Sequence, residues 1–147
     1  MPRSCRDCLP MMPTELSAVL PARHIQEECG VFGVYDPAGG CAQTTYYGLY
    51  ALQHRGQEAC GIATINDREQ SFYKDVGLVS EVFDKQTLQR LNGTMAVGHV
   101  RYATTGARER ENAQPLTIKY VKGTLAVVHN GNLVGVDQLR QKFEYQG

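Results

Sequence analysis

The sequence predicts an α+β protein in which an antiparallel β-sheet forms the core and helices pack outside it. Two observations support this fold class. Apolar runs of strand length recur along the chain, and two pairs of these runs are separated by short polar turns of the kind that close hairpins. Outside these pairs, residues recur at helical spacing. The 147 residues are enough to bury the core of one domain.

The first predicted elements are a strand and a helix. The apolar run at residues 30–35 ends at Asp36-Pro37 and predicts a buried strand. Four residues then fall at helical spacing: Thr45, Tyr46, Leu49 and Leu52. Gly56 follows where the C-terminal cap of that helix is expected.

A hairpin and a short helix are predicted next. Residues 61–65 and 71–74 flank a polar turn at residues 66–68, which predicts two paired strands. Asp84 is placed to cap the N-terminus of a short helix around Leu88.

The last third of the chain predicts three strands and a helix. Residues 95–102 are strand-like. Residues 116–121 are expected to pair with residues 124–128 across the turn at 122–123. A closing helix is expected to begin near Val136.

Residues 1–28 differ from the rest of the chain because they show no sustained periodicity and hold four of the six prolines. We expect them to be a leader or propeptide, or an upstream extension created by a misplaced start, with Met11 and Met12 as later start positions. The folded domain is then residues 29–147. Cys5 and Cys8 form a single C-x-x-C, and two ligands cannot close a tetrahedral zinc site, so we interpret the pair as incidental.

Composition excludes several classes of function. The net charge is zero, so there is no electrostatic case for binding nucleic acid or an anionic membrane. No apolar run has the length of a membrane span, and the stretch at residues 16–22 is a poor secretory signal. An odd count of five cysteines favours reduced thiols, and with them a cytoplasmic location.

Cys29 is the first candidate for chemistry. It opens the apolar run at residues 30–35, after the weakly patterned leader. If the peptide bond before it is cut, Cys29 carries both a thiol and a free α-amine, with pKa values near ~8.5 and ~8. The amine could then act as the base that activates its own side chain. The alternative is an inert cysteine buried in the core.

Arg101 and Asn130-Gly131 are further candidates, each with a simpler alternative. Arg101 ends a predicted strand, where its planar fork could hold a substrate carboxylate or form a surface ion pair. Asn130-Gly131 offers a side-chain amide and an unhindered N–H that could hold an oxyanion. The same dipeptide is also common in tight hairpin turns.

Three histidines suggest a Cys–His hydrolase as another alternative: His54, His99 and His129. Their spacing matches no zinc signature.

Five motifs in order resemble the glutaminase domain of the glutamine phosphoribosylpyrophosphate amidotransferases (amidophosphoribosyltransferases), a class II glutamine amidotransferase domain of the N-terminal-nucleophile hydrolase type. The motifs lie at residues 29–33, 52–58, 98–106, 111–115 and 129–133. The resemblance implies a four-layer αββα sandwich that is truncated at its C-terminus in this chain. It also implies autocatalytic removal of the residues before Cys29.

The resemblance assigns a role to each matching residue. Cys29 is implied to be both nucleophile and, through its α-amine, base. The other implied roles are the oxyanion hole (Asn130 and Gly131), the grip on the α-carboxylate of glutamine (Arg101), the shape of the pocket (Thr104) and the ordering of the nucleophile (Arg55).

The implied activity is the first step of de novo purine (IMP) synthesis, in which 5-phosphoribosylamine is made from glutamine and phosphoribosylpyrophosphate. In the family, a Ser-Asp-Ser/Thr-Glu motif and the phosphoribosylpyrophosphate-binding half follow the point where this chain stops. We therefore expect an N-terminal fragment. The resemblance implies no cofactor in this segment, Mg²⁺ in the remainder of a homo-oligomeric parent enzyme, and leaves an iron–sulfur cluster there as an open point.

Two alternatives stay open. Hexosamine phosphate synthase has the same type of domain, but its motif resembles Glu-Tyr-Arg-Gly-Tyr-Asp, whereas residues 53–58 here read Gln-His-Arg-Gly-Gln-Glu. That stretch and residues 112–115 favour the purine enzyme. A non-catalytic truncated remnant is the other alternative, because each visible catalytic residue could survive in a chain that no longer closes its pocket.

Overall fold

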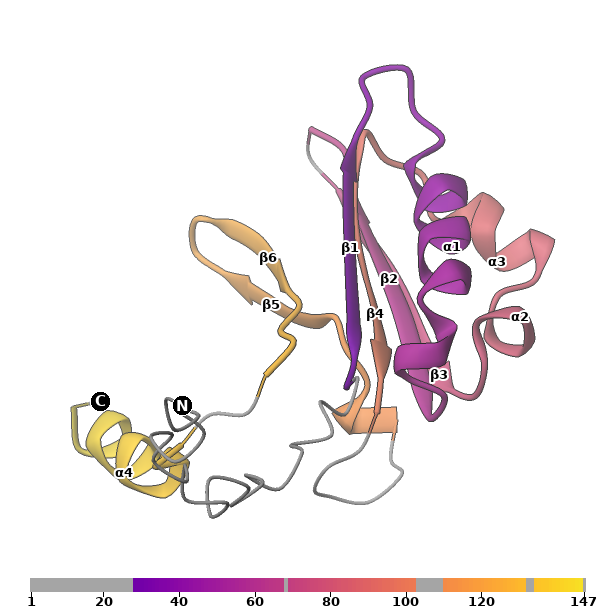
Figure 1. Cartoon of the computed structure of the whole chain (residues 1–147). Helices are drawn as coiled ribbons and strands as arrows, with labels where there is room; N and C mark the ends of the chain where they lie inside the picture. Colours follow the sequence, from indigo (N-terminus) through magenta and orange to yellow (C-terminus); the bar gives the residue numbers. More distant parts are fainter. Residues whose placement is uncertain (1–27, 68, 103–109, 132–133, 147) are drawn as a thin grey trace, which may run out of the picture.

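The computed structural model describes residues 28–67, 69–102, 110–131 and 134–146. Its main sheet has four antiparallel strands in the order β1-β4-β2-β3 (Figure 1). The strands are β1 (Gly30–Tyr35), β2 (Ala59–Ile65), β3 (Gln70–Val76) and β4 (Met95–Arg101). The predicted α+β class with an antiparallel sheet is therefore confirmed.

One face of this sheet is covered by helices, which Figure 1 shows beside the strands. They are α1 (Cys41–Ala51), the 3₁₀ turn η1 (Gln53–Arg55), α2 (Val79–Val82) and α3 (Lys85–Arg90). Leu49 of α1, Ile62 of β2 and Val100 of β4 are fully buried between the layers. Gly98 allows α1 to approach closely, since a Cβ there would lie 2.6 Å from Thr45 Cγ2.

The opposite face of the sheet is turned toward a separate hairpin (Figure 1). Strands β5 (Leu116–Tyr120) and β6 (Gly123–Val127) pair with each other as a two-stranded antiparallel sheet. A cavity of about 170 Å³ lies where this face meets the hairpin, and it is lined by Ala63, Ile65, Met95, Ala96, Val97 and Ala126. The final helix α4 (Val136–Gln146) lies beyond the hairpin, away from the main sheet (Figure 1).

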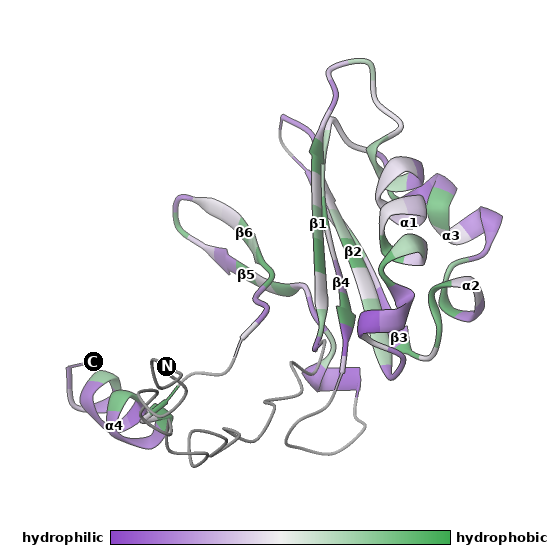
Figure 2. Ribbon diagram, in the orientation of Figure 1, coloured by the Kyte–Doolittle hydropathy of each residue, from purple (hydrophilic) through white to green (hydrophobic). Residues whose placement is uncertain are grey.

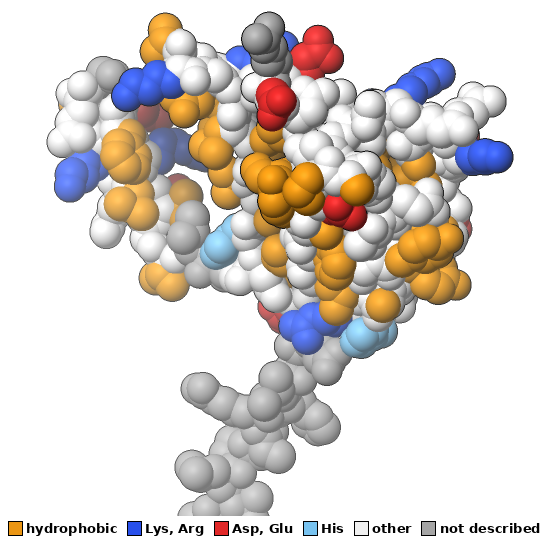
Figure 3. All heavy atoms as spheres, turned by 90° about the horizontal axis from the view of Figure 1, so that it is seen from above, with side chains coloured by type: hydrophobic (Ala, Val, Ile, Leu, Met, Phe, Trp, Pro, Cys, Tyr) orange, Lys and Arg blue, Asp and Glu red, His pale blue; other side chains and the backbone are white. Residues whose placement is uncertain are grey.

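Hydropathy follows these layers. Figure 2 shows hydrophobic residues along the strands and on the parts of α1, α2 and α3 that meet them. In the hairpin and α4, by contrast, large hydrophobic side chains are exposed, and some of the exposed hydrophobic atoms are visible in the space-filling view (Figure 3). Ile118 is 53% exposed and Phe143 is 66% exposed.

Most elements match the predictions. Both hairpins form, α4 begins at Val136, and Asp84 caps α3 by accepting a hydrogen bond of 2.7 Å from the main-chain N–H of Thr87. The turn of the second hairpin falls one residue earlier than predicted, because Tyr120 pairs with Gly123.

Three expectations were wrong or incomplete. The strand β1 is not fully buried: it lies at the edge of the sheet, and Val31 and Tyr35 on its uncovered face are 41% and 66% exposed. Gly56 does not cap α1, because the chain continues into η1, and Gly56 ends that turn in an extended conformation. The short helix α2 was not predicted.

Candidate active site

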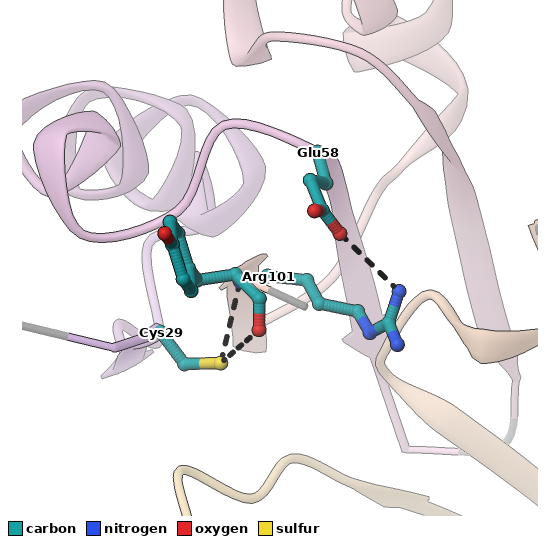
Figure 4. Close-up of polar contacts among 4 residues, drawn as sticks. Cys29, Glu58 and Arg101 are labelled. Atoms are coloured by element: carbon teal, nitrogen blue, oxygen red, sulfur yellow. Dashed lines mark hydrogen bonds and ion pairs between the residues drawn. The ribbon is translucent and has the colours of Figure 1, made fainter. Parts of the chain in front are cut away.

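Cys29 lies at the end of the main sheet, next to the last residues of β4. The β1–β4 register pairs Gly30 with Val100, which brings Cys29 level with Arg101. The main-chain N–H of Tyr102 donates a hydrogen bond to the Cys29 sulfur at 3.4 Å, and the sulfur lies 3.6 Å from the Tyr102 carbonyl oxygen. The half-buried thiol is therefore held by the backbone that follows β4, as Figure 4 shows.

The backbone of Cys29 is itself unusual. Its φ angle is 56°, in the left-handed region that residues other than glycine rarely adopt. Such a conformation costs roughly 1–3 kcal/mol and persists only where surrounding contacts fix it. Contacts of this kind are present at Cys29, on both its sulfur and its carbonyl oxygen.

The turn after α1 brings Arg55 to Cys29. Gln53 fixes this turn: its amide donates to the Gly56 carbonyl and accepts a hydrogen bond of 2.7 Å from the Val79 N–H. Gly56 packs directly on the main chain of Arg101, where a Cβ would lie 2.7 Å from the carbonyl carbon. Arg55 Nε can then donate to the Cys29 carbonyl oxygen at 2.7 Å.

The same turn places Glu58 beside Arg101. The two side chains form an ion pair of 3.6 Å, and the exposed fractions of the two side chains are 12% and 17%. Figure 4 shows the Arg101 side chain directed toward Glu58. Arg101 thus forms the ion pair that was its simpler alternative, although both side chains are largely shielded from solvent. Any carboxylate that binds at Arg101 must share the guanidinium with Glu58 or displace it.

Asn130, which follows strand β6, also reaches Cys29. Its amide Nδ2 lies 3.5 Å from the Cys29 carbonyl oxygen, as a long hydrogen bond. The tight turn of this hairpin falls at residues 121–122, so Asn130-Gly131 is not that turn. Gly131 has φ of 155°, and a Cβ there would lie 2.9 Å from the His129 ring, which explains the glycine.

The structure thus brings four of the predicted site residues together around the end of β4. Arg55 and Asn130 both contact Cys29, and Arg101 is level with it in the sheet register. Thr104 lies outside the described residues. The α-amine of Cys29 is joined to Glu28 in this chain, so the predicted amine base requires cleavage of that bond.

Two of the three candidate histidines have surroundings that fit a structural role. His54 Nδ1 lies 3.1 Å from the Ala51 carbonyl oxygen at the end of α1. His99 is fully buried in β4, and burial is the main cause that lowers its pKa to about 4, so it is neutral near pH 7. Neither ring nitrogen of His99 reaches a hydrogen-bond partner among the described residues, although the nearby main chain of His129 favours the protonated form and partly offsets the effect of burial.

The other described cysteines are less suited to act as nucleophiles. Cys41 and Cys60 are buried, whereas Cys29 is partly exposed, and all three are free thiols. Burial, reinforced by the negative charges of Asp75 and Glu81, raises the pKa of Cys60 to about 12. A thiol with such a pKa forms almost no thiolate at neutral pH.

Two residues at the site were not predicted from the sequence. Glu58 was noted only as part of a motif, and its pairing with Arg101 depends on how the turn packs against β4. Gln114 was likewise noted only within a motif, yet its side chain binds the main chain of His129, the residue before Asn130. No local pattern signals either contact, because each joins segments that are far apart in the sequence.

The described residues contain no group of three His, Cys, Asp or Glu side chains that could hold a metal ion. None of the helices in the described part of the chain has the length and apolarity needed to span a bilayer.

The chain belongs to the class II glutamine amidotransferases, because the model of that family matches residues 31–147. Within the family, its relatives include amidophosphoribosyltransferases. The one from Synechocystis sp. is 52% identical over 122 residues, which are 83% of this chain and 25% of the relative. The one from Mycobacterium bovis is 56% identical over 115 residues, which are 78% of this chain and 22% of the relative.

Solved structures agree with this assignment. Glutamine phosphoribosylpyrophosphate amidotransferase from B. subtilis, complexed with ADP and GMP, superposes with a TM-score of 0.71 at 46% identity, over 80% of this chain and 25% of that structure. A structure described as the allosteric regulatory enzyme of purine biosynthesis gives a TM-score of 0.74 at 47% identity, with the same coverage. The chain spans about a quarter of the length of the curated relatives it matches.

Proposed function

We propose that this chain is the glutaminase part of an enzyme that makes 5-phosphoribosylamine from glutamine and phosphoribosylpyrophosphate, the first step of de novo purine synthesis. The observation that carries the proposal is the meeting of three motifs at one cysteine. Arg55 and Asn130 contact Cys29, and Arg101 lies level with it. The relatives' names favour this enzyme over a hexosamine phosphate synthase.

The proposed reaction begins after the bond before Cys29 is cut. The free α-amine accepts the thiol proton through a bridging water, and the sulfur attacks the amide carbon of the glutamine side chain. The new C–S bond converts the amide oxygen into an oxyanion, which Asn130 Nδ2 and the Gly131 N–H stabilise. The intermediate collapses as the C–N bond breaks, and the proton held by the amine passes to the leaving nitrogen to give ammonia.

Water then hydrolyses the resulting thioester. The α-amine takes a proton from the attacking water, a second tetrahedral intermediate forms at the same oxyanion hole, and the C–S bond breaks to release glutamate and the free thiol. In the complete enzyme, the ammonia passes to the phosphoribosyl site.

Charged residues around Cys29 orient the reactants in this proposal. Arg101 holds the α-carboxylate of glutamine through its planar fork. Arg55 orders the nucleophile, since it already holds the Cys29 carbonyl oxygen at 2.7 Å. Thr104 shapes the pocket. We propose that this segment needs no cofactor of its own. The Mg²⁺ and any iron–sulfur cluster of the parent enzyme are proposed to lie outside this chain.

The proposal includes the finer architecture of the domain. The hairpin β5–β6 and helix α4 form the third and fourth layers of an αββα sandwich, which further strands beyond this sequence complete. Two features support this arrangement: the hairpin lies on the face of the main sheet opposite α1, and its apolar side chains are exposed (Figure 1). A homo-oligomeric, cytoplasmic enzyme whose catalytic chain begins at Cys29 is part of the same proposal.

The test is an assay of the full-length protein that contains this sequence. We expect phosphoribosylpyrophosphate to be consumed with either glutamine or ammonia as nitrogen donor, and N-terminal sequencing of the active protein to begin at Cys29. An active protein that retains residues before Cys29 would contradict the amine-base mechanism. Activity with a hexose phosphate in place of phosphoribosylpyrophosphate would point to the hexosamine enzyme. Activity with neither acceptor would point to a non-catalytic remnant.

A further inference from the structure

Gln114 holds the main chain immediately before the proposed oxyanion hole. The His129 N–H donates to Gln114 Oε1 at 2.6 Å, and Gln114 Nε2 donates to the His129 carbonyl oxygen at 3.2 Å. This pair of hydrogen bonds imitates one rung of a β-ladder, with a side-chain amide in place of the second strand. His129 is directly followed by Asn130, so Gln114 restrains the segment that carries both oxyanion donors.

The segment that carries Gln114 is itself anchored on the main sheet. Lys74 Nζ of β3 donates to the carbonyl oxygen of Ala113, a residue that is completely buried. Arg110 Nε donates to the Lys74 carbonyl oxygen at 3.1 Å, and its guanidinium lies 5.8 Å from the centre of the Tyr73 ring. Residues 110–113 are therefore attached to β3 through both side chains and main chain.

Gln114 also packs on β2. Gly61 lies directly beneath the carbonyl oxygen of Gln114, and a Cβ at Gly61 would collide with that oxygen and lie 2.9 Å from Pro115 Cδ. The backbone of Gln114 is thus seated on the sheet while its side chain reaches the His129 main chain. In contrast, β6, which leads to His129, has no fully buried residue.

We propose that Gln114 is the positioning residue of the oxyanion hole. It transmits the placement of β2 and β3 to Asn130 and Gly131, which directly follow the residue that Gln114 holds. This inference rests on the proposed function. Because oxyanion donors act on charge that develops in the transition state, their misplacement lowers kcat and leaves ground-state binding of glutamine at Arg101 unchanged. Losing a whole donor typically costs ~10²–10³ in rate, which sets an upper bound for losing its support.

Two substitutions test the proposal in the full-length protein. Gln114→Ala removes both hydrogen bonds to His129. Gln114→Glu keeps the size and the acceptor for the His129 N–H but removes the donor, so it opens no cavity. Gln89→Ala is the matched control, because Gln89 is an exposed glutamine on α3. We expect both Gln114 variants to lower the glutaminase kcat by about tenfold or more, with the glutamine KM within about twofold of wild type.

A second readout separates positioning from general damage to the fold. An aldehyde analogue of glutamine forms a tetrahedral adduct with the thiol, and the adduct oxygen occupies the oxyanion hole. Its inhibition constant should rise by the same factor by which kcat/KM falls, while alkylation of Cys29 by iodoacetamide and the ammonia-dependent activity should match wild type. The control should behave as wild type in each assay.

Several outcomes would overturn the proposal. These are an unchanged kcat in both variants, a rise in KM in place of the fall in kcat, or a parallel loss of the ammonia-dependent activity. Hydrogen exchange at the His129 amide distinguishes failure of the proposed role of Gln114 from failure of the proposed glutaminase function. Faster exchange in Gln114→Ala, in a protein whose wild type hydrolyses no glutamine, would leave the support by Gln114 standing and reject the glutaminase. Unchanged exchange would reject the support itself.

Discussion

The two halves of the candidate site belong to parts of the molecule that are packed very differently. Cys29, Arg55 and Arg101 belong to the layer formed by the main sheet and α1, whose core residues such as Leu49 and Ile62 are completely buried. Asn130 and Gly131 follow the hairpin β5–β6, in which no strand residue is fully buried. Cys29, the proposed nucleophile, therefore borders a close-packed layer and is held there by hydrogen bonds from Tyr102 and Arg55, whereas the proposed oxyanion donors follow a hairpin without such a core.

This difference shows how a site between two structural layers is divided. In the proposed mechanism, a close-packed layer carries the atom that would form the covalent bond, and packing leaves the backbone of such a layer little freedom. The second layer, as described here, depends on polar contacts with the first: Gln114 to His129 and Asn130 to Cys29. Damage to the first layer should affect stability and catalysis together, and damage to the second should affect catalysis alone.

The largest effect is expected for the nucleophile. Cys29→Ser should lower the glutamine-dependent activity of the full-length protein by at least ~10³-fold, since removing a nucleophile from a hydrolase costs up to ~10⁶ in kcat. Ammonia-dependent activity should stay close to wild type, because free ammonia does not need the thiol. Steady-state assays with each nitrogen donor measure both effects. A matching loss with both donors would indicate that Cys29 is a structural residue.

A pair of isoleucines tests the contrast in packing. Ile62 in β2 is completely buried, and Ile118 in β5 is 53% exposed. Ile62→Ala should lower the free energy of unfolding by ~2–5 kcal/mol, the usual cost of such a cavity in a core. In the 147-residue chain, where Ile118 is half exposed, Ile118→Ala should cost about 1 kcal/mol or less. The urea midpoints of unfolding of the two variants of this chain compare the two costs. Equal losses would mean that the hairpin is packed as firmly as the main sheet.

The elements of the fold that the sequence predicted depend on short-range signals. The polar turn after Ile65 and the cap at Asp84 act within a few residues, so both could be recognised directly. The position of β1 at the edge of the sheet could not be recognised in this way, because the order of the strands is a property of the whole sheet.

The site shows the same division. Cys29, Arg55 and Arg101 were found through motifs, and the structure brings them to one end of the sheet. Glu58 directly precedes β2, and Arg101 is the last residue of β4. Their ion pair follows from the β2–β4 register, which pairs Ala59 with Arg101. Register is a property of the assembled sheet, so a single segment does not reveal it.

The pH dependence of stability tests the surroundings of His99 in β4. His99 is fully buried, and burial is the main cause that lowers its pKa to about 4. Its pKa is near 6.5 in the unfolded chain, so between pH 6.5 and about 4 the unfolded state binds the additional proton. The contribution of neutral His99 to the free energy of unfolding is therefore fully present above pH 6.5. It falls by up to ~1.4 kcal/mol per pH unit as the pH drops toward 4.

His99→Gln removes this proton linkage while keeping a polar side chain. We expect a shallower fall of the urea midpoint between pH 6.5 and 4 in this variant, whatever its stability at pH 7. His54→Gln is the control, since His54 is exposed at the end of α1 and its variant should retain the wild-type slope. A wild-type slope in His99→Gln would show that other groups cause the acid sensitivity.

Among the changes at the candidate site, a smaller effect than that of Cys29→Ser is expected at Arg101, the proposed contact with the substrate. Arg101→Lys keeps the positive charge and the neighbouring Glu58 but removes the planar fork that fits a carboxylate. Charge-assisted hydrogen bonds contribute ~1.5–3 kcal/mol each, and an ammonium recovers only part of this, so the glutamine KM should rise at least tenfold, or ~1.4 kcal/mol. Ammonia-dependent synthesis should barely change, because ammonia has no carboxylate to hold. Steady-state kinetics with each nitrogen donor measures the two parameters. An unchanged glutamine KM would assign Arg101 to the ion pair with Glu58 alone, and the proposed binding site for the α-carboxylate would have to be withdrawn.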